Sequence, residues 1–300
     1  MSEKKQFIWN EIFRSQEGEG PWSCRNVVYF RTSGCNMTCA GFNNPENVEI
    51  TNEVLGFDPK DFINVLDLPP ISIGCDSLYS HDKRFAHLWK RSTTNEVIDE
   101  FEKLLPFGKW VHPKTFQPYI LSLTGGEPTN HQTKLPLLFS DPRMVDLRHI
   151  LIETNCSVDL KQPFIDSICT WLSGDSRRRW TWSNSPKLAI SGEPHDKAIR
   201  PEVALMQRQV VEKFPTQCDQ YFKFVADETD AAFEEVGTVM QEYYDAGIPI
   251  EHSEVWVMPM ACTDDQQKVI AVAVAEQCLE RGYLFSFRIQ NALYSNAIGK

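Results

Sequence analysis

Apolar runs of strand length alternate with amphipathic stretches of helix length along most of the chain, starting near residue 26. Repeated alternation of this kind is typical of parallel βα units. The runs predict six strands, at residues 27–32, 119–123, 149–153, 180–188, 221–225 and 255–258. We therefore expect an α/β fold, a partial (βα)6-type barrel of parallel strands, with the active site at the strand C-terminal edge.

Three stretches between these runs have the start, spacing and end of amphipathic helices. The first opens at Thr94 and is closed by Pro106, the second opens at Thr229 and ends before Gly247, and the third follows Asp264 and ends before Gly282. Polar residues cap helix starts, and glycine or proline commonly follows helix ends. We expect their apolar residues, including Val269, Val272, Val274 and Cys278 of the third helix, to pack in the core.

Residues 40–74 interrupt the alternation. The segment is rich in asparagine and proline, with Asn43, Asn44, Pro45, Pro59, Pro69 and Pro70. Long loops within compact domains are usually functional or added, and closing a longer loop costs little extra entropy. We interpret 40–74 as an insertion within the cluster-binding loop of a single domain spanning residues 1–300.

Composition narrows the classes of partner. Forty-one acidic residues against thirty basic ones give a net charge of −11, which argues against a broad phosphate-binding surface for nucleic acid. The first residues are polar, and no apolar window approaches the roughly 18 residues of a membrane span. We expect a cytoplasmic protein that binds neither nucleic acid nor a membrane.

The cysteines give the first indication of chemistry. Their number, nine, is odd, and no secretory signal precedes them, so a disulfide framework is not expected. Cys35 and Cys39 directly follow the first predicted strand, in a loop suited to wrapping a cluster. A 4Fe-4S cluster that binds S-adenosylmethionine leaves one iron without a protein ligand, and so needs three cysteines. The usual third position holds Phe42, and the missing thiol is found at Cys75.

These three cysteines alone leave alternatives open. They could be ordinary loop and core thiols, or ligands of zinc, although no matching second pair is present. A second motif favours the cluster. Gly125, Gly126, Glu127 and Pro128 end the strand 119–123 at the same edge as the cysteines, and glycines there allow a ligand close to the backbone.

Together these motifs resemble the radical S-adenosylmethionine superfamily and, within it, the 7-carboxy-7-deazaguanine synthase family. The resemblance runs in order through almost the whole chain, except for the insertion. It is carried by the segments 12–21, 28–36, 75–77, 124–128, 153–155, 185–187, 223–225, 257–259 and 288–290. Two residues depart from the family pattern: Glu17 stands where glutamine is usual, and Gln290 stands where histidine is expected.

The resemblance implies a carbon–nitrogen lyase of 7-deazaguanine and queuosine biosynthesis. Such an enzyme converts 6-carboxy-5,6,7,8-tetrahydropterin to 7-carboxy-7-deazaguanine and ammonia by radical ring contraction. It implies a catalytic 4Fe-4S cluster on Cys35, Cys39 and Cys75, and Mg²⁺ at Ser77 with Asp76 as a helper. S-adenosylmethionine would bind at Gly125, Gly126, Glu127, Glu153, Ser185 and Lys187, and substrate at Glu17, Glu19, Arg31 and Gln290. Homodimers and an electron donor such as flavodoxin or ferredoxin are also implied.

Two other functions fit part of the pattern. A radical activase that generates a glycyl radical on a partner protein would share the cysteines and the glycine turn, but would not call for Glu17, Glu19 or Ser77. A catalytically inactive descendant that binds a protein or nucleotide would account for Phe42 and the split cysteine motif.

Overall fold

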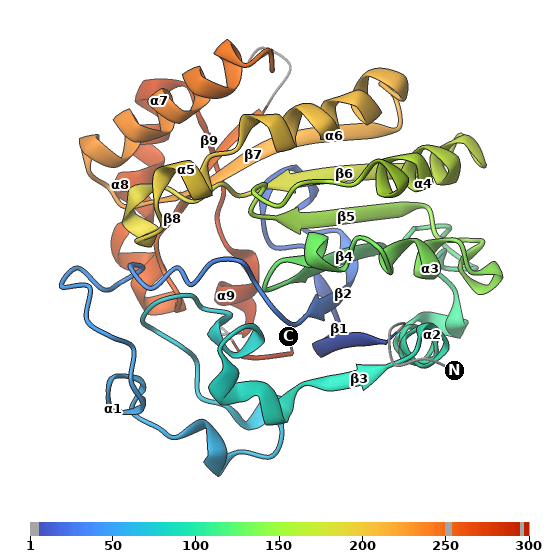
Figure 1. Cartoon of the computed structure of the whole chain (residues 1–300), viewed down its shortest axis with the longest axis horizontal. Coiled ribbons are helices and arrows are strands. Elements are labelled where there is room, and N and C mark those ends of the chain that lie inside the picture. Colours follow the sequence, from blue (N-terminus) through green and yellow to red (C-terminus); the bar gives the residue numbers. More distant parts are fainter. Residues whose placement is uncertain (1–5, 250–253, 295–296, 300) are drawn as a thin grey trace.

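The computed structural model describes residues 6–249, 254–294 and 297–299. Their strands form one open nine-stranded sheet in the order β3-β1-β2-β4-β5-β6-β7-β8-β9 (Figure 1). From β2 to β9 neighbouring strands are parallel, whereas β1 is antiparallel to both β2 and β3. The strands are β1 (Phe7–Gln16), β2 (Asn26–Thr32), β3 (Lys90–Ser92), β4 (Ile120–Gly125), β5 (His149–Thr154), β6 (Arg179–Asn184), β7 (Cys218–Ala226), β8 (Glu254–Pro259) and β9 (Leu284–Phe285).

All six expected strands are present, as β2 and β4 to β8, and the expected partial barrel of parallel strands is confirmed. The expected strand 180–188 is too long, because β6 ends at Asn184 and is followed by Ser185 and Pro186. Proline has no N–H to donate to a neighbouring strand, so the pairing cannot continue through it. The strands β1, β3 and β9 were not expected from the sequence.

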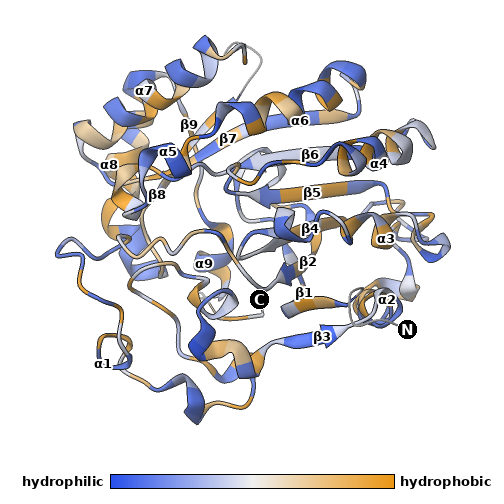
Figure 2. Ribbon diagram, viewed as in Figure 1, coloured by the Kyte–Doolittle hydropathy of each residue, from blue (hydrophilic) through white to orange (hydrophobic). Residues whose placement is uncertain are grey.

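The helices are α1 (Asn52–Leu55), α2 (Thr94–Leu104), α3 (Leu135–Phe139), α4 (Gln162–Ser173), α5 (His195–Ala198), α6 (Pro201–Lys213), α7 (Asp230–Asp245), α8 (Asp264–Arg281) and α9 (Ile289–Tyr294). The three expected helices are α2, α7 and α8. Their starts are capped by the side chains of Thr93, Thr229 and Thr263. Figure 2 shows hydrophobic and hydrophilic residues alternating along the covering helices, as expected for helices with one face on a sheet.

The expectation that every apolar residue of α8 packs in the core is wrong. Val274 and Cys278 are buried, but Val269 and Val272 are 80% and 71% exposed. Val274 comes five positions after Val269, which places the two side chains about 140° apart around a helix. They therefore lie on different faces, and only one of these faces contacts the sheet.

The core lies between the sheet and its helices and is rich in aromatic side chains. Trp180 and Trp182 of β6 are fully buried, and both contact the ring of Phe164 on α4 edge-on. On the other flank the ring of Phe30 in β2 lies 5.7 Å from that of Phe101 in α2. Interlocked rings of this kind fix the strands relative to the helices, and so fix the strand ends that carry the pocket described below.

Residues 40–74 form a long excursion beside the carboxyl ends of the strands (Figure 1, blue to light blue). The excursion contributes to a small separate apolar cluster, which consists of Val65, Leu68, Ile71, Leu78, Tyr79, Phe85 and Leu88. Ile298, near the end of the described chain, packs against this cluster. The excursion is therefore folded against the domain rather than extended into solvent.

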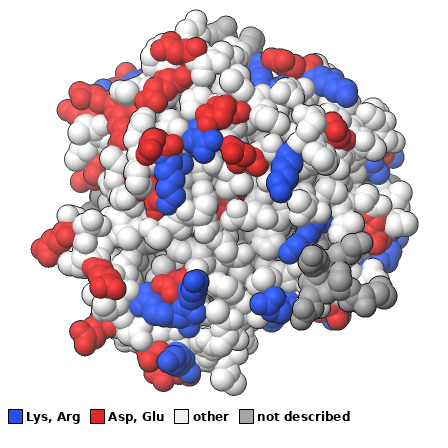
Figure 3. All heavy atoms as spheres, viewed as in Figure 1, with Lys and Arg blue, Asp and Glu red and all other residues white. Residues whose placement is uncertain are grey.

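Charge is distributed unevenly over the surface. Figure 3 shows acidic side chains gathered over α7, a helix whose sequence contains no lysine or arginine. On the face shown, basic side chains lie singly or beside acidic ones. Among the described helices, none combines the length and hydropathy needed to cross a membrane.

Candidate active site

A cavity of about 250 Å³ opens at the carboxyl ends of the strands. Its wall combines residues of β1, β2, β4, β5, β7 and β8 with residues of the loop after β6, the cysteine loop, the 40–74 excursion and the end of the described chain. Most residues expected to be functional line it: Glu19, Arg31, Cys35, Cys39, Cys75, Ser77, Gly125, Gly126, Glu153, Ser185, Lys187 and Gln290. Glu17 and Glu127 do not line it and are buried behind it.

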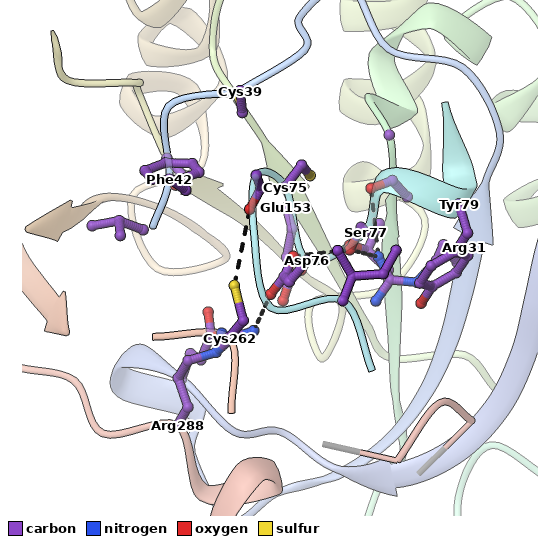
Figure 4. A pocket seen from close by; sticks show the side chains of 18 of the residues that line it. Arg31, Cys39, Phe42, Cys75, Asp76, Ser77, Tyr79, Glu153, Cys262 and Arg288 are labelled. Carbon is purple, nitrogen blue, oxygen red and sulfur yellow. Dashed lines mark hydrogen bonds and ion pairs between the residues drawn. The ribbon is translucent and has the colours of Figure 1, made fainter. Parts of the chain in front are cut away.

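The cysteines 35, 39 and 75 share this cavity despite their separation in sequence. Cys75 lies near the cysteine loop because the amide of Gly74, the preceding residue, donates a hydrogen bond to the carbonyl oxygen of Phe42, at 2.7 Å. Figure 4 shows Cys39, Phe42 and Cys75 around one part of the cavity. The thiol of Cys262 lies 3.9 Å from the carbonyl oxygen of Gly74. The excursion thus leaves and re-enters the cysteine loop at one point.

The three thiols are largely shielded from water. Burial raises the pKa of Cys35 to about 12 and that of Cys39 to about 11, and it raises the pKa of Cys75 well above its usual value. Buried thiolates are stable only beside positive charge, which iron supplies. This donor set fits a cluster that is held by three thiolates.

A single metal ion fits less well. Among the described residues, no three His, Cys, Asp or Glu side chains converge closely enough to hold one ion. Each cysteine of a 4Fe-4S cluster binds a different iron, so the three thiols need to surround a larger space. The described residues therefore do not form the compact group of ligands that a structural zinc ion requires.

The glycine turn after β4 is shaped by contact with β2 and the cysteine loop. A Cβ on Gly125, whose φ is +140°, would lie 2.1 Å from the carbonyl oxygen of Thr32. A Cβ on Gly126 would lie 2.3 Å from the carbonyl oxygen of Gly34 and 3.1 Å from the Cβ of Cys35. Both positions therefore require glycine, and both present backbone to the cavity.

Glu127 is buried behind the cavity, where it connects the loops that follow β4 and β5. Its carboxylate accepts hydrogen bonds from the amide and hydroxyl of Thr129, at 2.9 and 2.6 Å. It also accepts them from the hydroxyl of Thr154, at 2.9 Å, and the amide of Asn155, at 2.7 Å. Burial raises the pKa of this carboxyl despite these donors. In this structure Glu127 connects the ends of β4 and β5 rather than facing the cavity.

Glu19 lies in a cluster of alternating charges. It pairs with Lys223 of β7 and accepts a hydrogen bond from Arg288 Nε at 3.0 Å and from Gln290 Nε2 at 3.2 Å. Burial alone would raise the pKa of the Glu19 carboxyl, but the charges of Lys223 and Arg288 lower it to about 2. Arg288 Nη2 also binds Asp76 at 2.5 Å.

Glu17 differs sharply from Glu19. Its side chain is buried, and its Oε2 atom has no hydrogen-bond partner among the described residues. Burial, and then the nearby charge of Glu153, raises the pKa of the Glu17 carboxyl to about 8. A protonated carboxyl has a donor on one oxygen and an acceptor on the other, so it resembles the glutamine amide, which has an NH2 donor group and a carbonyl acceptor. The departure from glutamine at this position therefore changes the hydrogen-bonding groups little near neutral pH.

Arg31 is fixed by groups that the sequence did not reveal. Its Nε lies 3.0 Å from Glu11 Oε2, and this carboxylate also accepts a hydrogen bond from the Tyr79 hydroxyl at 2.7 Å. Arg31 Nη1 donates to Ser77 Oγ at 2.9 Å, and this hydroxyl contacts Asp76 Oδ1 at 3.2 Å. Ser77 and Asp76 thus place oxygen atoms at the cavity wall, where they accept hydrogen bonds from Arg31 and Arg288.

The remaining expected residues lie at the ends of β5 and β6. Glu153 accepts a hydrogen bond from Thr124 Oγ1 at 2.8 Å, and Lys187 donates one to Ser185 Oγ at 3.0 Å. The residues that sequence reasoning missed are Glu11, Tyr79, Lys223 and Arg288. A lysine within the apolar run 221–225 was a usable signal, because charged residues are seldom buried without a partner.

Comparisons with known proteins agree with this architecture. No protein-family model matches the chain. The chain is 23% identical over 296 residues to the 7-carboxy-7-deazaguanine synthase of Rhodopirellula baltica, which covers 99% of this chain and 90% of that protein. The crystal structure of QueE from Escherichia coli matches 94% of this chain and 93% of its own, with a TM-score of 0.50 and 16% identity. The resemblance drawn from the motifs is thereby confirmed, and the solved structure shares the fold.

Proposed function

We propose that this chain is a radical S-adenosylmethionine lyase of the 7-carboxy-7-deazaguanine synthase type. Its reaction is the conversion of 6-carboxy-5,6,7,8-tetrahydropterin to 7-carboxy-7-deazaguanine and ammonia. The observation that carries the proposal is the presence of Cys35, Cys39 and Cys75 in one cavity, beside the backbone of Gly126. The near full-length resemblance to the Rhodopirellula baltica synthase supports the same reaction.

The three cysteines would hold a 4Fe-4S cluster, and the adjoining strand ends would hold S-adenosylmethionine. The reduced cluster, when bound, supplies the electron for reductive cleavage of S-adenosylmethionine. Gly125 and Gly126 would offer backbone groups to the cofactor, with Glu127 keeping their turn in place. Glu153, Ser185 and Lys187 project polar atoms into the same cavity and would bind its ribose and methionine groups.

Substrate would bind beside these groups, at the part of the wall that contains Arg31, Glu19 and Gln290. Arg31 is a bidentate donor suited to a carboxylate, and its guanidinium is held at the cavity by Glu11 and Ser77. Glu19 and the neutral form of Glu17 would accept or exchange hydrogen bonds with the amine and ring N–H groups of a pterin. Gln290 would reach substrate from its contact with Glu19, and Ser77 with Asp76 would bind Mg²⁺.

The cavity wall also explains how water would be kept from the reaction. Phe42, Pro70 and Ile71 of the excursion and Ile298 near the chain's end form an apolar part of the wall. Exclusion of water and fixed orientation are the two contributions that proteins make to such cofactor chemistry. We further propose one domain over residues 1–300 with 40–74 as an insertion, a cytoplasmic homodimer, and flavodoxin or ferredoxin as the reductant.

The proposal is tested by product analysis. Anaerobically reconstituted protein is incubated with carboxytetrahydropterin, S-adenosylmethionine, Mg²⁺ and dithionite, with Cys35→Ala as the matched control. Mass spectrometry should detect 7-carboxy-7-deazaguanine with the wild type only. Cleavage of S-adenosylmethionine without deazaguanine would contradict the synthase reaction and favour an activase, and neither cleavage nor iron uptake would favour an inactive descendant.

A further inference from the structure

A buried carboxylate outside every motif discussed above lies under the cysteine loop. Glu193 follows β6 in sequence, and its side chain is 2% exposed. Its Oε1 atom accepts hydrogen bonds from the amide of Thr38 at 2.5 Å, the amide of Cys39 at 2.8 Å and the hydroxyl of Thr38 at 2.8 Å. One oxygen atom thus holds the loop beside its second cysteine.

The backbone of the loop is shaped to receive this charge. Cys39 has a φ of +48°, in the left-handed region that residues other than glycine seldom adopt. Successive amides in such a conformation point toward one position and form a concave site for an anion. Here the anion is Glu193, which offsets the unfavourable conformation of Cys39.

The same segment fixes the loop at a second point. The amide of Gly41 donates to the carbonyl oxygen of Ser191 at 2.9 Å, and a Cβ on Gly41 would lie 2.6 Å from the carbonyl oxygen of Ile190. The other oxygen of Glu193 binds Lys197 Nζ at 2.5 Å, at the edge of the site. The loop is therefore held by the β6–α6 connection whether or not a cluster is bound.

This arrangement bears on the electronic properties of the cluster proposed above, on which the inference rests. The reduction potential of an iron–sulfur cluster depends on net charge and on hydrogen bonds to its sulfurs. Amides engaged by Glu193 are not available to sulfur, and the carboxylate adds negative charge beside Cys39. We propose that Glu193 is a positioning residue that fixes the Cys35–Cys39 loop and holds the reduction potential of the cluster low.

The test compares two substitutions that remove charges of opposite sign near Cys39. Glu193→Gln keeps an oxygen that can accept from both amides but removes the negative charge, whereas Lys197→Met removes the positive charge. Glu212→Gln is the control, because Glu212 pairs with Arg208 on the surface of α6 and is 68% exposed. Iron and sulfide content and the midpoint potential, from a redox titration followed by electron paramagnetic resonance, are measured for each reconstituted protein.

The expected result is a higher midpoint potential in Glu193→Gln, a lower one in Lys197→Met and no change in Glu212→Gln, relative to the wild type. A loss of iron in Glu193→Gln would support the anchoring role, and Lys197→Met would then decide the electrostatic role. Unshifted potentials in both loaded variants, or shifts in the same direction, would overturn the inference while leaving the proposed function intact. Wild-type protein that takes up no iron would overturn both.

Discussion

The carbonyl oxygen of Phe42 accepts a hydrogen bond from the amide of Gly74 at 2.7 Å, and this bond joins the two ends of the 40–74 excursion. Phe42 occupies the position where a third cysteine is usual, and Cys75 directly follows the residue bonded to it. The hydrogen bond therefore places Cys75 close to this position in the fold, as the proposed cluster requires. The inserted residues add little to the free-energy cost of closing this loop, since the entropy of loop closure grows only with the logarithm of loop length.

The excursion should be stabilised by its own apolar cluster. Leu68 is 5% exposed within that cluster, whereas Leu66, two residues earlier, is 55% exposed. Leu68→Ala should lower the free energy of local unfolding by about 2–5 kcal/mol because it leaves a cavity. Native-state proteolysis of the 40–74 excursion measures this change. The control Leu66→Ala should change cleavage little, and equal cleavage of the two variants would contradict the described packing.

Glu17 should make stability depend on pH. Its pKa is raised from 4.5 to about 8, so between these values the folded protein retains a proton that the unfolded chain has lost. Stability therefore falls as the pH rises through this window. Glu17→Gln removes the titrating group, so the variant should match the wild type near pH 5 and exceed its stability by about 2–4 kcal/mol near pH 9.

Urea denaturation of both proteins at the two pH values provides the measurement. A constant difference between wild type and variant across this range would show that the Glu17 carboxyl is already ionised at low pH. The idea that it replaces glutamine as a neutral group would then fail.

Tyr79 should act on substrate through Glu11 and Arg31. Tyr79→Phe removes the hydroxyl that donates to Glu11 Oε2 at 2.7 Å, the atom that also fixes Arg31. A hydrogen bond to a charged group contributes about 1.5–3 kcal/mol, so the KM for carboxytetrahydropterin should rise about tenfold or more, with little change in kcat. The control is Tyr244→Phe on α7, whose side chain is 49% exposed. A lower kcat with unchanged KM would assign Tyr79 a different role.

Glu127 should contribute mainly to the stability of the fold rather than to the binding of S-adenosylmethionine. In Glu127→Gln an amide group replaces one carboxylate oxygen, so that a donor faces either Asn155 N–H or the Thr129 and Thr154 donors. A mismatch of buried donors costs about 1–3 kcal/mol, and guanidinium denaturation should show a loss of that size. The control is Glu100→Gln on α2, because Glu100 is 43% exposed and, among the described residues, pairs only with the exposed Lys103. Unchanged stability with weakened S-adenosylmethionine binding would favour direct contact with the cofactor instead.

The parallel strands could be predicted because both of their faces are buried, which produces continuous apolar runs such as 27–30. The strand β1 could not, because its buried positions include Asn10 and Glu11, and these polar residues conceal the pattern. For the same reason Glu11 was missed as the partner of Arg31. The site motifs were visible because they are contiguous in sequence, whereas the Glu19–Lys223–Arg288 cluster joins residues from distant segments and depends on the fold.

The central claim is that Cys75 is the third ligand of the cluster, and iron and sulfide analysis tests it most directly. Cys262 is a matched comparison because it lines the same cavity, and the buried Cys278 of α8 lies outside it. The account predicts about four irons per chain in the wild type, in Cys262→Ala and in Cys278→Ala, and a loss in Cys75→Ala as complete as in Cys35→Ala. Full iron and sulfide content in Cys75→Ala, or their loss in Cys262→Ala in its place, would contradict it.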